Sequence, residues 1–251
     1  MTEPLVPARP PIAARAAYQP QWPSEAFIVP LLRALIEEGL QRYAAPAPAG
    51  GCALDVGCGG QPFRSLLETM GYAYTGFDVQ QNPAGSVAVV GAIDATLPAA
   101  VLERGPFHFI LCTEVLEHVA RWDVAFANLA RLLHPGGRLL VTCPHFYPPH
   151  EEPYDFWRPT SNAVELFARR ADLVPLEVRR AGDAGDIVGT LLAVTRFRAA
   201  HRRLLDHVVA ALAQAQRRLL VAALRSRTIR RRLRVNGAMY LSTFAVFEKP
   251  A

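Results

Sequence analysis

Short apolar runs alternate with longer segments of helical periodicity along most of the chain. Apolar runs typical of buried strands occur near residues 52–56, 73–78, 87–90, 107–112, 138–142, 173–179 and 239–247. Before the first of them, residues 24–43 carry apolar side chains at helical spacing, and Ser24 is placed to cap that helix. Continuous apolar strands separated by helices are typical of a parallel sheet covered on both faces. The pattern therefore predicts an α/β fold, with ligands bound beyond the carboxyl ends of the strands.

Two segments fall outside this alternation. The N-terminal segment is rich in proline and alanine, so we expect residues 1–23 to form an extended arm. Residues 190–236 contain neither glycine nor proline, and apolar side chains recur there every three or four positions. We therefore predict an insertion of one or two amphipathic helices over residues 187–235. The sheet domain is then formed by residues 24–186 and 236–251.

The positive charge of the chain is concentrated in this insertion. The formal net charge is +5, but residues 196–234 hold 12 arginines and one acid, which leaves the rest of the chain negative. Three hypotheses explain such a segment. It could lie on an anionic membrane and bring the site to a lipid-linked substrate, or bind nucleic acid, which we favour least. We favour a lid or a homodimer surface, with the apolar stripe packed on the protein core and the arginines in solvent.

Length and composition fit one globular domain with an elaboration. The chain has 251 residues, and 51% of them are hydrophobic, which is ample for a core. The first residues lack the features of a secretory signal, and no apolar stretch approaches the ~18 residues of a membrane span. We expect a cytoplasmic protein, at the inner face of the membrane if the insertion binds lipid. The cysteines lack metal-ligand spacing, so we expect small core residues and no metal site.

The strongest indication of function is the segment Leu54–Gly60, where an apolar run with an acid near its end leads into a glycine-rich bend. Asp78 follows at the end of the next apolar run. A turn without side-chain bulk lets backbone N–H groups approach a ligand closely, and an acid one strand away can accept hydrogen bonds from two ribose hydroxyls. The sequence therefore predicts a site for a nucleoside-containing cofactor.

Two departures from the dinucleotide-binding fingerprint narrow the choice of cofactor. The third glycine, which allows a helix N-terminus to approach a pyrophosphate, is replaced by Pro62. Asp55 lies two residues before the first glycine, where a carboxylate would repel a pyrophosphate but would suit an ammonium group. S-adenosylmethionine has a ribose, an amino-acid tail and no phosphate, so we predict it as the cofactor.

Five segments in this order and spacing resemble the motifs of class I S-adenosylmethionine-dependent methyltransferases. They are Leu54–Gly60, Phe77–Asp78, Ile93–Ala95, Thr113–Val119 and Arg131–Gly137. The resemblance implies a Rossmann-like, seven-stranded, mostly parallel sheet with helices on both faces, whose last strand is antiparallel and follows the helical insertion. The cofactor-binding residues that it implies are Asp55, Gly57, Cys58, Gly59, Asp78, Val79, Asp94, Ala95, Thr113, Glu114 and His118.

The acceptor site is expected in residues 144–158, which follow the fifth predicted strand and are dense in titratable and aromatic groups. The pattern resembles a bacterial subgroup of the family that is associated with cell-surface glycans and secondary products. His150 is our first candidate for a catalytic base and His145 the second, because imidazole titrates near neutral pH. A histidine that orders the loop is an equal alternative for either. The candidate acceptor-binding residues are Tyr147, Tyr154, Asp155, Trp157 and Arg158.

Alternatives remain for several of these residues. For Asp155 and Arg158 we favour an ion pair that fixes the loop over direct catalysis, and the aromatic residues could equally form a small core of the loop. Glu117 and His118 could close the pocket or make structural hydrogen bonds. We predict an enzyme that methylates oxygen on a small molecule or glycan, in secondary-metabolite or surface-polysaccharide biosynthesis, with nitrogen or carbon as alternative acceptors. The hypothesis from a different class is a noncatalytic scaffold with the same fold.

Overall fold

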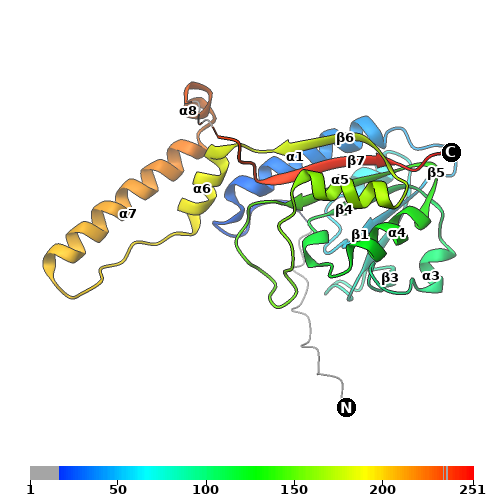
Figure 1. The fold of residues 1–251 in the computed structure, drawn as a ribbon, viewed down its shortest axis with the longest axis horizontal. Helices are drawn as coiled ribbons and strands as arrows, with labels where there is room; N and C mark the ends of the chain where they lie inside the picture. Colours follow the sequence, from blue (N-terminus) through cyan, green and yellow to red (C-terminus); the bar gives the residue numbers. More distant parts are fainter. Residues whose placement is uncertain (1–16, 234, 236) are drawn as a thin grey trace, which may run out of the picture.

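A seven-stranded sheet with the order β3-β2-β1-β4-β5-β7-β6 forms the centre of the molecule (Figure 1). The computed structural model describes residues 17–233, 235 and 237–251, so most of the predicted N-terminal arm lies outside the described residues. The strands are β1 (Cys52–Val56), β2 (Ala73–Asp78), β3 (Val89–Val90), β4 (Phe107–Thr113), β5 (Leu133–Pro144), β6 (Val174–Ala181) and β7 (Ser242–Glu248).

The predicted mostly parallel sheet with an antiparallel last strand is confirmed. Strands β1 to β5 pair in parallel, and β7 runs antiparallel to both of its neighbours, β5 and β6. The differences lie at strand ends. Strand β3 is limited to Val89–Val90, and β5 begins at Leu133, five residues before the predicted start. Gly136, with φ of +76°, allows the chain to bend within this longer strand.

Helices cover both faces of the sheet. One face carries α3, α4 and α5, whose apolar side chains form one core cluster with the sheet, and the other face carries α1, α2 and α6 in a second cluster. The helices are α1 (Glu25–Tyr43), α2 (Arg64–Thr69), α3 (Ala99–Leu102), the 3₁₀ helix η1 (Leu116–His118), α4 (Trp122–Leu132), α5 (Ser161–Arg170), α6 (Ala184–Val194), α7 (Leu204–Arg225) and α8 (Arg227–Arg232).

The order of the strands reverses between β1 and β4. From β1 the chain continues to β2 and β3 on one side, whereas β4 and β5 lie on the other side. The segments that leave the carboxyl ends of β1 and β4 therefore diverge and leave a crevice, which is where open α/β sheets bind ligands. The predicted motif residues lie at this edge.

Helix α1 begins where it was predicted, but Ser24 does not cap it. The Ser24 hydroxyl instead accepts a hydrogen bond from the hydroxyl of Tyr147 (2.9 Å). The side chain of Glu25 accepts hydrogen bonds from the backbone N–H groups of Gln21 (2.6 Å) and Trp22 (3.1 Å). The start of α1 is thereby tied to the segment that follows β5, and both border the site described below.

The insertion between β6 and β7 contains three helices instead of the predicted one or two. Helix α6 packs on α1, α7 packs on α6, and α8 follows α7. Asp183 and Asp186 form a capping box at the start of α6, and Arg230 of α8 makes ion pairs with them (2.9 and 3.0 Å). Helix α7 projects away from the sheet domain (Figure 1).

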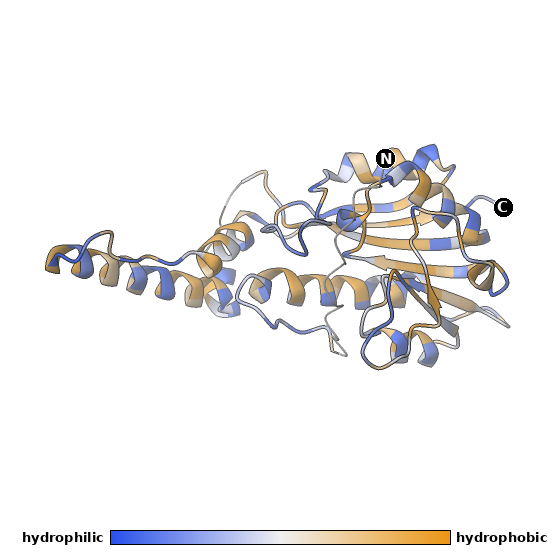
Figure 2. Ribbon diagram, turned by 90° about the horizontal axis from the view of Figure 1, so that it is seen from below, coloured by the Kyte–Doolittle hydropathy of each residue, from blue (hydrophilic) through white to orange (hydrophobic). Residues whose placement is uncertain are grey.

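The apolar stripe of α7 is uncovered, contrary to the expectation that it packs on the protein core. Leu204, Leu212 and Leu219 expose 81%, 62% and 71% of their surface, whereas Leu224, close to the end of the helix, is buried. Figure 2 shows apolar and polar residues mixed along this projecting helix. Nine of the eleven described arginines between residues 196 and 233 are exposed. The insertion therefore presents apolar and basic groups together.

Replacing Gly39 with valine is expected to lower the free energy of unfolding by about 1–3 kcal/mol, because overpacking a tight contact costs that much. A Cβ at Gly39 would lie 2.7 Å from the Phe244 ring and 2.8 Å from Leu140, where α1 meets the sheet. Denaturant titration measures the change. Ala34→Val places the same side chain at an exposed position of α1 and should change stability by less than about 0.7 kcal/mol. Equal effects of the two substitutions would contradict the packing argument.

Candidate functional site

The turn after β1 leaves no room for a side chain at Gly57. Gly57 has φ of +68°, and a Cβ there would lie 2.1 Å from Cγ2 of Val115, which follows β4. The next glycine, Gly59, donates its N–H to Oδ2 of Asp78 (2.9 Å), and the N–H of Val79 bonds Oδ1 (2.7 Å). These contacts fix a buried carboxylate at the end of β2, next to a turn made of backbone alone.

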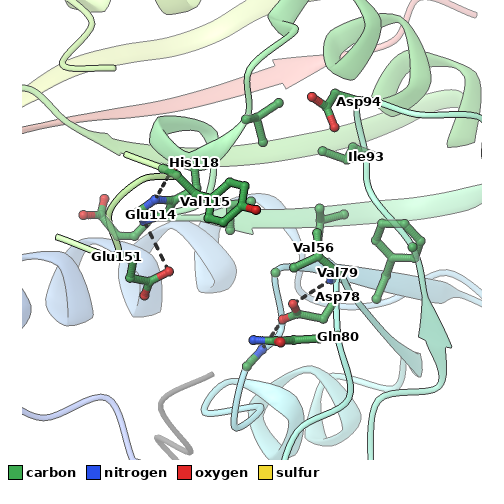
Figure 3. A pocket seen from close by; sticks show the side chains of 16 residues that line it. Val56, Asp78, Val79, Gln80, Ile93, Asp94, Glu114, Val115, His118 and Glu151 are labelled. Atoms are coloured by element: carbon green, nitrogen blue, oxygen red, sulfur yellow. Dashed lines mark hydrogen bonds and ion pairs between the residues drawn. The ribbon is translucent and has the colours of Figure 1, made fainter. Parts of the chain in front are cut away.

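A pocket opens over these strand ends (Figure 3). Asp78 and Gln80 lie on one side of it, and His118 and Glu151 lie on the opposite side. An ionised carboxylate has about four acceptor positions. Backbone N–H groups of Gly59, Val79 and Gln80 bond to Asp78, so a position remains for a ligand hydroxyl. The apolar lining comes from Val56, Val79, Ile93, Val115 and Val119. This combination fits a ribose held by Asp78 and a flat base between apolar side chains.

A second pocket continues from the first, with the turn after β1, Glu114 and His118 among the residues common to both. Asp55 lines this second pocket, and the hydroxyl of Tyr74 donates a hydrogen bond to it (2.7 Å). Burial raises the pKa of Asp55 to about 7. A ligand ammonium group here would stabilise the ionised form. The two pockets together therefore fit a nucleoside with a cationic amino-acid tail.

Two acids follow β4, Glu114 partly buried and Glu117 fully buried. Glu114 has φ of +54°, an uncommon conformation for a residue with a side chain, of the kind that concentrates at functional sites. Burial raises the pKa of Glu114 to about 7. Glu117 of η1 is fully buried, and burial together with the charge of Glu114 raises its pKa well above the usual value. The second pocket is therefore rich in acids that are costly to ionise without a cation nearby.

The segment 145–160, between β5 and α5, closes the second pocket and is fixed by an ion pair. Arg158 donates to both carboxylate oxygens of Asp155 at 2.7 Å, as expected from the sequence. Burial opposes ionisation of Asp155, but the hydrogen bonds from Arg158 prevail and hold the pKa of Asp155 below its usual value. Burial, and next the neighbouring His118, lower the pKa of His150. The loop therefore has its own electrostatic support and presents His150 to the pocket.

Backbone contacts join this loop to η1. The N–H groups of Phe156 and Trp157 donate to the carbonyl of Glu117 (2.8 and 3.2 Å). In the other direction, Nδ1 of His118 donates to the carbonyl of Tyr154 (2.9 Å). These three hydrogen bonds bring the titratable groups of two distant segments into one cluster.

Most residues proposed from the sequence line one pocket or the other. Of the proposed residues, Val79, Asp94 and Tyr154 line the pocket with Asp78. The second pocket is lined by Asp55, Cys58, Thr113, Tyr147 and His150. Gly57, Gly59, Glu114 and His118 line both. The residues that line neither pocket are Ala95, His145, Asp155, Trp157 and Arg158.

The residues outside the pockets have structural contacts instead. His145 stacks on Tyr240 with ring centroids 4.3 Å apart, and its Nδ1 donates to the carbonyl of Pro159 (3.0 Å). Its position therefore does not favour the predicted role as a second base. Trp157 packs against Trp122 at 6.0 Å, which fits the alternative of an aromatic core of the loop. Ala95 presents its carbonyl to Asn128 (2.8 Å).

Sequence reasoning missed the contribution of α1 to the second pocket. Glu25, Val29 and Leu32 line it, although they precede the first motif by more than 20 residues. No local pattern distinguishes these positions from the rest of an amphipathic helix. Gln80 and Glu151 were missed as well, although each follows directly on residues that the motifs had already singled out.

Fold, pocket and family together define the class of the protein. A family model described as a methyltransferase domain matches residues 31–171, and the chain belongs to this family. The sheet, the glycine turn and Asp78 are those expected of its class I S-adenosylmethionine-dependent members. The residues present fit the cofactor of that class: a carboxylate for the ribose, an apolar slot for the base and a buried acid for the ammonium group.

Curated relatives resemble the part of the chain that carries the motifs. A protein named ubiquinone biosynthesis O-methyltransferase from Caulobacter vibrioides is 34% identical over 119 residues, which is 42% of this chain and 47% of that protein. A protein of the same name from Xanthomonas oryzae pv. oryzae is 31% identical over 103 residues, 38% of this chain and 43% of that protein. The chain therefore spans less than half the length of these relatives.

Solved structures with this fold include proteins named for different reactions. A [4+2]-cyclase named SpnF matches with a TM-score of 0.51 and 18% identity, covering 86% of this chain and 80% of that one. An S-adenosylmethionine-dependent methyltransferase from Archaeoglobus fulgidus matches with a TM-score of 0.50 and 13% identity, covering 86% and 94%. At such identities the likeness shows the fold alone, so the reaction has to be argued from the site.

Cofactor affinity is expected to fall by up to about tenfold per pH unit below pH 7. Asp55 is protonated in the free protein below its pKa of about 7, whereas the ammonium group of the cofactor favours the ionised form, so binding releases a proton. Calorimetry in two buffers of different ionisation enthalpy measures this release. Asp55→Asn lacks this proton and should bind weakly, with a smaller release of protons and a smaller pH dependence in this range. Affinity of the unmodified protein that is constant from pH 6 to about 7 would contradict the assignment.

Proposed function

We propose that the protein transfers the methyl group of S-adenosylmethionine to a hydroxyl oxygen of a small molecule. The observation that carries the proposal is the carboxylate of Asp78, held by Gly59 and Val79 at the edge of a pocket whose opposite side leads to a second pocket. The first pocket together with Asp55 of the second has the groups for the cofactor, and the rest of the second pocket is proposed to take an acceptor.

The bound cofactor supplies a methyl carbon activated by its sulfonium sulfur. The task of the protein is then to hold the acceptor oxygen in line with that carbon, and correct positioning alone accounts for a large part of such an acceleration. Asp78 and Asp55 anchor the two ends of the cofactor, so its reactive centre lies between them. His118 and Glu114, which border both pockets, are then the side chains next to this centre.

The acceptor is proposed to enter the second pocket under the loop of residues 145–160. Of the two bases considered from the sequence, His150 lines this pocket and is the one within reach of an acceptor hydroxyl. Tyr147 lines the same pocket, and its ring meets His150 edge-on with centroids 5.1 Å apart. Both side chains therefore contribute to the wall against which the acceptor is held.

Oxygen is proposed as the acceptor atom because the curated relatives are named O-methyltransferases. Their names refer to ubiquinone biosynthesis and not to a glycan or a secondary metabolite, so we place a small-molecule hydroxyl before the sugar hydroxyl of the sequence-based hypothesis. A panel that contains phenols, aliphatic alcohols, sugars and amines tests both atom and class.

Turnover is expected on at least one hydroxyl compound of such a panel, with S-adenosylhomocysteine as the co-product detected by mass spectrometry. Asp78→Asn should weaken cofactor binding by about 10- to 100-fold, since hydrogen bonds to a charged group contribute about 1.5–3 kcal/mol each. Asp123→Asn makes the same change at an exposed acid of α4 and should leave binding unchanged. Undiminished binding by the Asp78 variant would refute the site. Cofactor binding with turnover of amines alone would refute the proposed acceptor atom.

We also propose that α7 lies on an anionic membrane surface, where it would bring the pocket to a membrane-borne acceptor. The support is the exposed apolar stripe of α7 together with the nine exposed arginines of the insertion, of which Arg218 and Arg225 lie on α7 itself. Apolar and basic groups are combined in helices that lie in a lipid interface. None of the described helices has the length and apolarity that a bilayer crossing requires. The proposed contact is therefore peripheral.

The protein is expected to sediment with vesicles that contain phosphatidylglycerol, less so at high salt, and not with neutral vesicles. Leu212→Glu should weaken this association by about 10- to 100-fold, because it removes an apolar group that would enter the lipid. Leu166→Glu, at a partly exposed position of α5, is the matched control. Binding to RNA in place of anionic vesicles would favour the nucleic-acid hypothesis and exclude this one.

A further inference from the structure

Three side chains of the kinds that bind metal ions converge in the second pocket. Ligand atoms of Glu117, His118 and His150 all lie within 4.8 Å of one another. Nε2 of His118 is 3.8 Å from Oε1 of Glu117 and 3.9 Å from Oε2 of Glu151. Neighbouring ligands about 2.0–2.2 Å from one metal ion are about 3.0–3.6 Å apart in octahedral or tetrahedral geometry, so the side chains of the cluster have to move together by up to roughly 1–2 Å to hold an ion.

The histidines are held in the orientation of metal ligands. A ligating histidine usually donates its other ring N–H to a carbonyl or carboxylate, which fixes the tautomer. Nδ1 of His118 donates to the carbonyl of Tyr154, which leaves Nε2 as the acceptor facing Glu117. Nδ1 of His150 lies 3.3 Å from the carbonyl of Pro148, 3.5 Å from Oδ2 of Asp155 and 3.4 Å from Nη2 of Arg158. The tautomer in which Nδ1 donates to the carbonyl or the carboxylate leaves Nε2 for the cluster.

Glu117 provides an independent indication of a ligand. The residue is fully buried, and its Oε1 has no hydrogen-bond partner among the described residues. Its other oxygen has a long contact from the thiol of Cys143 (3.9 Å). A buried carboxylate oxygen without a partner is costly, and this one is aimed at the imidazole of His118. A cation in the cluster would satisfy it.

The charge of the pocket also favours a cation. Five carboxyl groups line it, and neither lysine nor arginine is among its described lining residues. In the proposed function one of them, Asp55, meets the ammonium group of the cofactor. Glu25 is occupied by backbone N–H groups at the start of α1. Glu114, Glu117 and Glu151 remain, and the nearest cation, Arg158, lies outside the pocket lining and is paired with Asp155.

We infer that Glu117, His118 and His150 bind a divalent metal ion, with Glu151 placed to become a fourth ligand. This inference rests on the proposed function for its role in catalysis and replaces the sequence-based expectation of no metal site. Two imidazoles with carboxylate oxygens favour a first-row transition ion such as Mn²⁺, Fe²⁺, Co²⁺ or Zn²⁺ over Mg²⁺ or Ca²⁺. Two histidines and one carboxylate leave coordination positions open toward the pocket.

With an ion bound, His150 would have a different role. An acceptor hydroxyl at an open position loses its proton to water more readily, because a bound cation lowers the pKa of an oxygen ligand. The acceptor oxygen then forms its bond to the methyl carbon while the carbon–sulfur bond breaks, and the electron pair of that bond remains on sulfur as the sulfonium becomes a thioether. In this arrangement Nε2 of His150 is a ligand and not a base.

The test starts from the full chain dialysed against a chelator. Titration with Mn²⁺, followed by calorimetry and by the loss of the free-ion paramagnetic resonance signal, should show saturable binding of one ion per chain. Glu117→Gln and His150→Gln should each weaken this binding at least about tenfold, whereas His201→Gln, on the exposed insertion, should not change it. The visible spectrum of the Co²⁺ form should change in the two cluster variants. Cofactor binding by the same variants shows that they are folded.

Absence of saturable ion binding, or equal binding by Glu117→Gln and the unmodified chain, would overturn the inference. So would methyl transfer that continues at an unchanged rate after chelation, because His150 would then act as the base. A chain that binds S-adenosylmethionine but no ion would retain the proposed function and lose the metal site. A chain that binds one ion but no S-adenosylmethionine would retain the metal site and lose the proposed function.

Discussion

The contact between the turns after β1 and β4 is the constraint on which the site depends. Gly57 reaches Val115 so closely that any side chain at position 57 would displace the segment after β4. That segment contains Glu114 and η1, and the neighbouring Gly59 fixes Asp78 through its N–H. One position without a side chain therefore sets the distance between the carboxylate of β2 and the cluster on η1. The size of the pocket follows from the contact of a glycine with a valine side chain, and the polar groups only line it.

The parts of the molecule that could be predicted from the sequence are those determined by local rules. Apolar runs located every strand to within a few residues, and the bend at 57–60 placed Asp55 and Asp78 because both lie at strand ends on the same edge of a parallel sheet. Predictions were wrong where a contact depends on a residue far away in the sequence. Ser24 was expected to cap α1, but Tyr147, more than 120 residues later, takes its hydroxyl. The cluster of Glu117, His118 and His150 escaped notice for the same reason, since it depends on how residues 145–160 fold onto η1.

The insertion shows the limit of a helical pattern as evidence. An apolar stripe indicates that a helix buries one face, but it does not say against what. The stripe of α7 was assigned to the core of its own chain, whereas Leu204, Leu212 and Leu219 are exposed. The charge pattern gave better guidance. Acids gather in the pocket and arginines in the insertion, so two parts of the molecule carry charge of opposite sign, and the small net charge conceals both.

The way the insertion leaves the sheet has a consequence for how such proteins can diversify. Ala181, the last residue of β6, pairs with Ser242, the first residue of β7, and the N–H of Leu241 donates to the carbonyl of Ala181 (2.9 Å). The chain between Ala181 and Ser242 is one insertion, and the pairing of β6 with β7 holds its two ends together. Because the entropy of closing a loop grows only with the logarithm of its length, about 0.6 kcal/mol per doubling, this insertion can grow, shrink or be exchanged with little effect on strand register. The pocket and the insertion, which is proposed to determine where the protein is located, can therefore evolve separately.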